Sequence, residues 1–131
     1  DVGDAKNMEY TFDQMRAEGM RADTKTFCCL IRGYANAGLF HKVISMVELA
    51  GKLEIPENTS FHNAVIYACV KADDLMEMER VYRRMKDKQC RADATTFGIM
   101  VEAYKKEGMN DKVFDLEHEQ KQEQEMMLRV T

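Results

Sequence analysis

The sequence predicts an all-α fold, a right-handed α-solenoid of antiparallel helix hairpins with a 35-residue period. The first observation behind this prediction is a set of marks, Gly3, Gly38, Asp73 and Gly108, each 35 positions after the previous one. A fixed period of this size, without strand signals between the marks, is typical of a helical solenoid and not of a single globular core. The second observation is the composition: one proline and seven glycines in a chain that is 32% charged indicate helices joined by short turns.

The third observation is that other residue types recur in the same phase. A short polar residue precedes each unit, at Asp23, Asn58 and Asp93. Apolar and small residues recur at matching positions: Phe27 and Phe97, Ile31 with Ile66 and Val101, Tyr34 and Tyr104, Val43 with Met78 and Val113, and Ala37 and Ala72. Each set of matching positions, which we call a column, meets a different structural requirement. Their agreement on one spacing is therefore independent evidence for the 35-residue period.

The first helix of each unit is predicted from an apolar stripe with the spacing of one helical face. The stripe consists of Phe27, Leu30, Ile31 and Tyr34, and again of Phe97, Met100, Val101 and Tyr104. We therefore expect first helices over residues 24–36, 59–72 and 94–107.

The second helix of each unit is predicted from a second stripe. This stripe lies at Phe40, Val43, Val47 and Ala50, at Leu75, Met78, Tyr82 and Met85, and in the opening half-unit at Ala5, Met8, Phe12 and Met15. The glycine mark falls between the two helices, where a left-handed C-terminal cap costs little only for glycine, and Asp73 is a tolerated polar substitute there. Residues 19–23, 54–58 and 89–93 then link a second helix to the next first helix.

The period divides the chain into parts of one solenoid segment, residues 1–131. We expect the second half of a repeat at 1–23, full repeats at 24–58 and 59–93, and a last repeat at 94–131. In the last repeat the second stripe fails after Val113 and Phe114, because Glu117 and Gln120 occupy the expected apolar sites. This degenerate helix is expected to form a solvent-facing end of the stack. Because the chain opens on Asp1, in the middle of a repeat, we expect a fragment of a longer array.

Several classes of function find no support in the sequence. The four cysteines have no CxxC spacing and no secretory segment, which favours a reducing compartment, and no apolar run approaches the length that spans a membrane. The string HEQKQ, which begins at His118, starts like a zinc-protease motif but has Gln122 in place of the second histidine. We expect no catalytic residue, no metal ligand and no cofactor in this chain, so the chemistry of an enzymatic parent would lie outside it.

A polar face of the first helices follows from helical geometry. Positions 3, 7 and 11 residues after Lys25 lie on one side of the helix, away from the apolar stripe. The same face consists of Cys28, Arg32 and Asn36, then Ser60, Asn63, Tyr67 and Lys71, then Thr95, Gly98, Glu102 and Lys106. The three first helices carry 5 basic and 2 acidic residues, although the chain has 19 basic and 23 acidic residues. Stacked in parallel, these faces are expected to form a mildly basic groove, which suits phosphate.

Three strings of the chain resemble the pentatricopeptide repeat family, P class. They are DTKTFCCLIRGYANAG from Asp23, NTSFHNAVIYACVKAD from Asn58 and DATTFGIMVEAYKKEG from Asp93, each followed by an amphipathic helix such as LMEMERVYRRMKDK. The resemblance covers essentially the whole chain, and the period of 35 distinguishes it from the tetratricopeptide repeat, whose period is 34. The resemblance implies an α-solenoid that binds single-stranded RNA, one nucleotide per repeat, in plant chloroplasts or mitochondria.

The resemblance also implies which residues select a base. In this family the fifth residue of a repeat acts with the last one, which gives the pairs Cys28 with Asn58 and Asn63 with Asp93. The second pair resembles the combination that favours uracil, since an amide both donates to and accepts from a base edge. Cys28 departs from the common pairs because a thiol forms weak hydrogen bonds, so this pair favours a pyrimidine at most. Gly98 offers no side chain and its partner would be Leu128, so the last unit is expected to select no base.

Other family positions are only partly matched. The second residue of a repeat, usually an aliphatic that sandwiches the base, is here Lys25, Ser60 or Thr95. These departures weaken base stacking, which is worth roughly 1–3 kcal/mol per base where aromatic residues supply it. Lys71 and Lys106 match a position that contacts phosphate in relatives. Asn36 stands at the same position and cannot supply that charge.

The same residues have ordinary structural interpretations. Short polar residues before a helix are common N-caps, which accounts for Asp23, Asn58 and Asp93 without any ligand. Asn63 could be a solvated polar residue, and Lys71 and Lys106 a charged surface. On the second helix, three arginines interleaved with acids, Arg80, Arg83 and Arg84, indicate i to i+4 surface pairs and not a nucleic-acid patch.

The leading functional hypothesis is single-stranded RNA binding in organellar RNA processing, stability, splicing or translation. It places the protein in a chloroplast or mitochondrion, on the family resemblance alone. The alternative is a protein-interaction scaffold with little or no RNA affinity, which docks a partner in its groove or on an acidic surface of its second helices. The net charge of −4 is compatible with this alternative. Neither hypothesis involves a membrane.

Overall fold

A computed structural model of the chain describes residues 2–19 and 23–130, apart from the side chains of residues 2–5, 8 and 130. The described residues form seven helices and no strand: α1 (Val2–Ala17), α2 (Thr24–Asn36), α3 (Phe40–Lys52), α4 (Thr59–Lys71), α5 (Leu75–Asp87), α6 (Ala94–Lys106) and α7 (Asn110–Val130). The predicted all-α class is therefore confirmed. The predicted first helices at 59–72 and 94–107 end one residue earlier, since Ala72 and Glu107 are C-caps.

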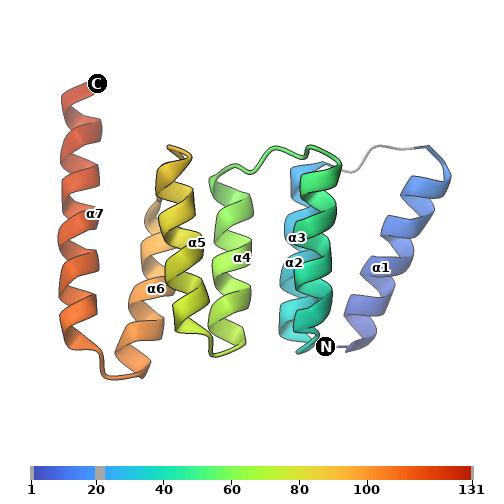
Figure 1. The fold of residues 1–131 in the computed structure, drawn as a ribbon, viewed down its shortest axis with the longest axis horizontal. Coiled ribbons are helices and arrows are strands. Elements are labelled where there is room, and N and C mark those ends of the chain that lie inside the picture. The colour runs from blue at the N-terminus through green and yellow to red at the C-terminus, as the bar shows by residue number, and fades with distance from the viewer. Residues whose placement is uncertain (1, 20–22, 131) are drawn as a thin grey trace. The chain divides into compact units, whose positions relative to one another are not determined.

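The chain forms two compact units, which divide after Arg91. In the first unit α2 lies between α1 and α4, and it pairs with α3 as α4 pairs with α5 (Figure 1). In the second unit α6 pairs with α7, whose 21 residues exceed the 13 of α6. Each first helix therefore forms a hairpin with the second helix that follows it, as the two apolar stripes predict.

N-terminal caps explain where the first helices begin. The Asp23 carboxylate accepts a hydrogen bond from the Thr26 backbone N–H (2.9 Å), and the Asn58 side chain accepts one from Phe61 (3.0 Å). Asp93 accepts from the Thr96 N–H (3.0 Å) and forms a capping box with that residue. The capping interpretation of the short polar column is thus confirmed, because each side chain satisfies a backbone donor that the helix leaves unpaired.

Left-handed residues end the first helices at the predicted marks. Gly38, Asp73 and Gly108 have φ values of 75°, 60° and 70°. Each lies in a Schellman-type turn: for example, the Leu39 N–H donates to the Tyr34 carbonyl at 2.9 Å. Gly3 does not mark such a turn, because it lies within the first turn of α1.

A second left-handed column ends the second helices and has the same 35-residue spacing. Gly19, Glu54 and Gln89 have φ values of 77°, 56° and 60°. The sequence pattern predicted these residues only as the start of a linker. Glutamate and glutamine have a steric cost in this conformation that glycine avoids, so two of the three turns are strained.

The core of the first unit contains much of the predicted stripes, but stripe residues such as Phe40, Val47, Leu75 and Tyr82 are only half-buried. On α5, Val81 is buried beside the half-buried Tyr82. Phe27 and Ile31 on α2 are fully buried, and Met78 and Met85 on α5 are too. The predicted stripe residues Ala5 and Met8 lie outside the described side chains. The first stripe is less regular in the second unit, where Phe97, Met100 and Tyr104 are buried but Val101 is only half-buried.

The stripe on α7 differs from the prediction. Phe114, expected to be an apolar stripe residue, has 72% of its surface exposed, whereas Leu116 is buried together with Val113. Val113 and Leu116 are three residues apart and share a helical face, from which Phe114 points away. Farther along α7 three apolar side chains, Met126, Met127 and Leu128, are exposed.

A polar contact fastens α1 to the α2–α3 hairpin. The Tyr34 hydroxyl donates to Glu9 Oε2 (3.0 Å), and the same oxygen forms an ion pair with the Lys42 ammonium (2.8 Å). The hydrogen bond from Lys42, and then that from Tyr34, hold the pKa of the Glu9 carboxyl below its usual value. One carboxylate on α1 thus connects both helices of the next hairpin.

Candidate nucleic-acid interface

The predicted polar face in the first unit is formed by side chains of α2 and α4. Neither helix contains an acidic residue between its first and last positions. Lys25, Asn36, Ser60 and Lys71 are exposed on this face. Three others, Cys28, Arg32 and Tyr67, are half-buried. The face is therefore accessible along α2 and at both ends of α4, and it carries only positive charge.

Asn63 is the exception on this face, because only 3% of its surface is exposed. Its interpretation as a solvated polar residue is therefore wrong. An amide that is buried this deeply must satisfy its polar atoms within the protein. Contact between Asn63 and a base would require the side chain to become uncovered first.

A tyrosine ring connects α2 to α4 at the end of this face. The Arg32 guanidinium carbon lies 5.1 Å from the centre of the Tyr67 ring, and the Lys71 ammonium lies 5.7 Å from it. The Tyr67 hydroxyl donates a hydrogen bond to Asn36 Oδ1 at 2.5 Å. Residues from both helices thus meet around one aromatic side chain, and two of them are cations.

Cys28 and Asn58, the other predicted base-selecting pair, have different surroundings. Burial raises the pKa of the Cys28 thiol, with a smaller opposing effect from the Arg32 charge, so the thiol stays neutral near pH 7. The Asn58 side-chain oxygen is engaged by the Phe61 N–H, which leaves the amide NH₂ as its remaining donor group. The NH₂ group is therefore the part of the Asn58 side chain that is wholly available to a base, while the oxygen retains one lone pair.

The predicted face of α6, in the second unit, has a different character. Thr95, Gly98, Glu102 and Lys106 are all exposed. Space beside Gly98 is open, since a Cβ at this position would meet no neighbouring atom of the described residues within 4 Å. Asp93 caps the same helix, and Leu128 is 76% exposed on α7. The α6 face thus combines one lysine with one carboxylate and offers no aromatic side chain.

Hydroxyl groups at the start of α2 and α4 contact the following linker. Thr24 Oγ1 donates to the Pro56 carbonyl (3.0 Å), and Thr59 Oγ1 donates to the Arg91 carbonyl (2.7 Å). Each bond joins residues 32 positions apart. The same contact therefore recurs at the period of the repeat.

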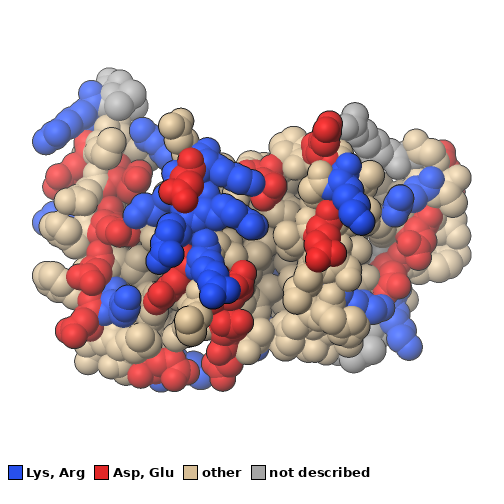
Figure 2. All heavy atoms as spheres, in the orientation of Figure 1, with Lys and Arg blue, Asp and Glu red and all other residues tan. Residues whose placement is uncertain are grey.

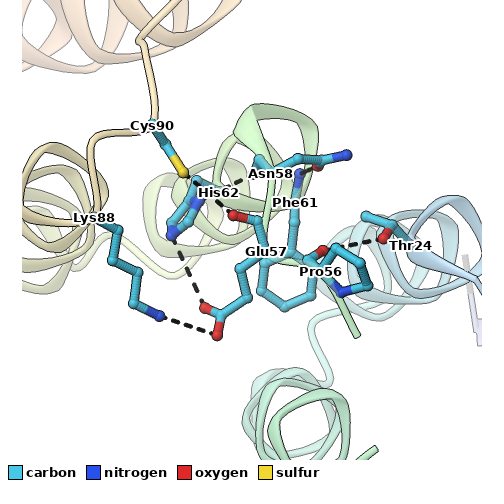
Figure 3. A network of polar contacts seen from close by, with 8 residues as sticks. All are labelled: Thr24, Pro56, Glu57, Asn58, Phe61, His62, Lys88 and Cys90. Atoms are coloured by element: carbon cyan, nitrogen blue, oxygen red, sulfur yellow. Dashed lines mark hydrogen bonds and ion pairs between the residues drawn. The ribbon is translucent and has the colours of Figure 1, made fainter. Parts of the chain in front are cut away.

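A polar network surrounds the linker between α3 and α4 (Figure 3). The Glu57 carboxylate forms an ion pair with Lys88 at 3.1 Å and lies 3.9 Å from His62 Nε2. The Cys90 thiol donates to the Glu57 carbonyl at 3.3 Å. This network holds the Glu57 side chain between His62 of α4 and Lys88 at the end of α5.

His62 is buried in this network, with 1% of its surface exposed. Its Nδ1 lies 3.0 Å from the Asn58 carbonyl, and its Nε2 has no hydrogen bond among the described residues. Burial lowers the pKa of the imidazole, although the Asn58 carbonyl and the Glu57 charge oppose that shift. His62 was not predicted from the sequence, but a signal was present: it occupies the column of Phe27 and Phe97.

The outer surface of α5 is basic, so the acidic surface expected on the second helices is wrong for α5. On α7, by contrast, six acidic residues outnumber three basic ones. Figure 2 shows Lys and Arg side chains gathered over α5, where Arg80, Arg83, Arg84 and Lys86 are exposed. Arg80 pairs with Glu77 at 3.2 Å, with a spacing of i to i+3 and not the predicted i to i+4. No ion pair of Arg83 or Arg84 occurs within residues 2–19 and 23–130.

An apolar cleft of about 280 Å³ lies between α3 and α5 in the first unit. Its floor includes Val65, Ala68 and Cys69 of α4, and its walls include Ile44 of α3 and Val81 of α5. Ile44 is 61% exposed. Burial raises the pKa of the Cys69 thiol to about 12, so this thiol is neutral and adds to the apolar character.

Neither a metal centre nor a membrane span is found in the described part of the chain. It contains no group of three or more His, Cys, Asp or Glu side chains placed to hold a metal ion. No described helix combines the length and the apolar character needed to cross a membrane.

Comparison with known proteins gives concordant matches. A model of the PPR repeat family matches residues 57–106, and a PPR repeat model matches residues 25–52 and 95–119. A chloroplastic pentatricopeptide repeat-containing protein of Arabidopsis thaliana is 76% identical over 84 residues, which cover 64% of this chain and 17% of that protein. A mitochondrial protein of the same description and plant is 27% identical over 82 residues, 63% of this chain and 16% of that protein.

A solved structure also matches. The crystal structure of the pentatricopeptide repeat protein PPR10 from maize aligns with a TM-score of 0.64 at 16% identity, over 92% of this chain and 18% of that one. At this identity the match concerns the fold, which is an all-α helical-repeat solenoid. This chain spans less than a fifth of the length of each of these relatives. The family models, the 76% identical relative and the fold agree, and the chain belongs to the pentatricopeptide repeat family.

Proposed function

We propose that this segment binds single-stranded RNA with the polar faces of its first helices. The observation that carries the proposal is the charge of these faces. The chain as a whole has a net charge of −4, yet α2 and α4 contain three basic residues and no acidic one. Segregation of positive charge onto one exposed face attracts a polyanion even when the whole chain is acidic.

Within this proposal, each predicted residue keeps a specific role. Lys71 and Lys106 contact phosphates, and both are exposed. The second residues of the repeats, Lys25, Ser60 and Thr95, lie beside the base, and all three are exposed as well. The last unit, with Gly98 and Leu128 at its base-selecting positions, binds RNA without choosing a base.

Base selection is proposed for two pairs. Asn63 with Asp93 favours uracil, and this role requires the buried Asn63 amide to become accessible when RNA binds. Cys28 with Asn58 favours a pyrimidine weakly, through the Asn58 NH₂ group. These assignments follow from the family resemblance. An exposed side chain can contact a base directly, whereas a buried one must first become uncovered.

The mechanism is occupation of a transcript and not bond-making by these residues. Bound protein excludes other proteins from the RNA and alters its folding, which affects processing, stability, splicing or translation. The names of two relatives include the words chloroplastic and mitochondrial. On that basis we propose that the whole protein acts in one of these organelles.

A salt titration tests the proposal. Binding of the segment to a uridine-rich oligonucleotide is measured by fluorescence anisotropy at increasing salt, and affinity should fall steeply because RNA binding releases counterions. Changing Lys71 and Lys106 together to glutamate should abolish binding at about 0.1 M salt. The matched control changes Arg80 and Arg83 to glutamate on α5, and it should retain binding. Equal loss in both double variants would contradict a site on the first helices.

A second candidate function is the docking of a partner protein, and the apolar cleft between α3 and α5 favours it. Exposed Ile44 at this cleft is an anchor of the kind that protein interfaces use. The Ile44→Glu substitution distinguishes the two functions. It should leave RNA affinity unchanged but remove any partner that copurifies with the full-length protein through this cleft.

A further inference from the structure

We propose that Arg32 and Lys71 together hold one phosphodiester group of the RNA, and that Tyr67 positions them. We call these three residues the phosphate clamp. The inference rests on the proposed RNA-binding function and adds Arg32 and Tyr67, which the family positions do not assign. It begins from the convergence of two cations, one from α2 and one from α4, on a single aromatic ring.

The two cations have no carboxylate partner in the described part of the protein. Neither Arg32 nor Lys71 forms an ion pair with any residue in the described ranges, and neither α2 nor α4 contains an acidic residue. Attraction to the ring face contributes only about 0.5–1 kcal/mol per cation at an exposed site. Two positive charges held near one ring, without a carboxylate partner, therefore create a local positive potential that attracts an anion.

The chemistry of the side chains favours a phosphate over a base. Tyr67 uses its ring to hold two cations and its hydroxyl to bond Asn36, so its binding groups are already engaged. The Arg32 guanidinium presents a planar set of N–H donors that fits two phosphate oxygens, and the Lys71 ammonium adds a mobile charge. The clamp therefore recognises the RNA backbone without regard to sequence.

The clamp also accounts for a missing lysine. Asn36 stands where Lys71 and Lys106 stand in the other repeats, and it has no charge. Arg32 lies one helical turn before Asn36 and supplies a positive charge to the same end of α2. Asn36 accepts the Tyr67 hydroxyl bond instead, which fixes the ring between the helices.

The test compares variants of the clamp in the same salt titration. Arg32→Gln should weaken binding about tenfold at 0.1 M salt and reduce the slope of log affinity against log salt by about 0.7, the value for one phosphate contact on a single strand. Arg32→Lys should retain the slope with a smaller loss of affinity, since it keeps the charge but not the planar donors. Tyr67→Leu should resemble Arg32→Gln, because both cations lose their support.

A modified oligonucleotide identifies the anion as the RNA backbone. Neutral methylphosphonate linkages are introduced one at a time, and one position should weaken wild-type binding while leaving Arg32→Gln unaffected. Arg83→Gln on α5 is the matched control, and it should behave as wild type in both experiments. Circular dichroism verifies that each variant is folded.

Two different results would overturn the inference, and they are distinguishable. If the wild type binds RNA but Arg32→Gln matches Arg83→Gln in affinity and slope, the clamp is wrong and the proposed function stands. If the wild type fails to bind any oligonucleotide at low salt, both are wrong.

Discussion

The α2–α4 face and the α6 face occupy the same positions of the repeat but differ in chemistry. At the ninth position of each unit, the first face has Arg32 and Tyr67, whereas α6 has Glu102. Asn63 is buried on the first face, whereas its counterpart Gly98 is exposed and lacks a side chain. The comparison shows that a shared backbone pattern does not give each repeat the same ligand contacts, because a single charge reversal changes what the surface attracts.

The largest expected effect concerns the packing that supports both faces. Phe27 and Phe97 occupy the same column in the two units and are 0% and 1% exposed. Changing either to alanine should reduce the free energy of unfolding by about 3–5 kcal/mol, because it leaves a cavity. Urea denaturation followed by circular dichroism measures the loss. Phe114→Ala is the control, and its exposed side chain should contribute less than about 0.5 kcal/mol.

The next effect should reduce the contrast between the two faces. Glu102→Arg removes the negative charge from the α6 face, so that both charged residues of this face are positive. RNA affinity should rise about tenfold at low salt, and the salt slope should steepen by about 0.7 for an added phosphate contact. An unchanged slope would mean that RNA does not follow the α6 face. Glu79→Arg on α5 serves as a matched charge reversal away from both faces.

A smaller effect should appear in the pH dependence of stability. The folded-state pKa of His62 lies below its unfolded value because the imidazole is buried, so the unfolded chain binds the proton more readily. The contribution of neutral His62 is therefore complete above about pH 6.5 and is lost as the pH falls below that value. Unfolding curves between about pH 7.5 and about pH 5 should show this decline.

The control for this pH effect is His62→Phe, which restores the aromatic residue of the Phe27 and Phe97 column. The variant should lose the part of the decline that arises between about pH 6.5 and 5, because no imidazole remains to be protonated. Glu9 has a lowered pKa, so its stabilising contribution is present throughout this pH range and is lost only as the pH falls below the usual carboxyl value. A decline of the same size in wild type and variant would contradict the assignment to His62.

The smallest effect concerns the left-handed turns. Asp73→Gly should stabilise the fold by about 1 kcal/mol, since glycine adopts a φ of 60° without a steric cost. Gln89→Gly should do the same at the end of α5. Gly108→Ala, at an equivalent turn in the second unit, should destabilise by a similar amount. Thermal unfolding measures all three, and destabilisation by Asp73→Gly would show that the aspartate side chain contributes more than its backbone strain costs.

Much of the fold could be predicted because its signals are local. Asp23, Asn58 and Asp93 cap helices through contacts three residues away, and Gly38 and Gly108 adopt the conformation that only glycine takes freely. Both kinds of signal depend on the chain near each residue, so a repeated spacing makes them visible. The left-handed Glu54 and Gln89 were missed because neither residue type signals that conformation.

The site was less predictable because it depends on contacts between helices. Helical geometry put Asn63 on the polar face but did not show that the amide is buried. It also grouped Arg32 with Cys28 on α2 and Tyr67 with Lys71 on α4, without showing that Arg32 and Lys71 approach one ring. On α7, the prediction placed both Val113 and Phe114 on the buried face, but only Val113 lies there. The residue that does share this face with Val113 is Leu116, three positions later.

The threonine bonds at the helix starts have a mechanical consequence. Thr24 bonds the start of α2 to the linker between α3 and α4, and Thr59 bonds the start of α4 to the linker between α5 and α6. Stretching the first unit along its stack must therefore lengthen these bonds. The corresponding residue at the start of α6 is Ala94, which has no hydroxyl to form such a bond. Resistance to extension therefore depends on single side chains, and a Thr59→Val variant would lower the force at which α4 and the linker after α5 separate.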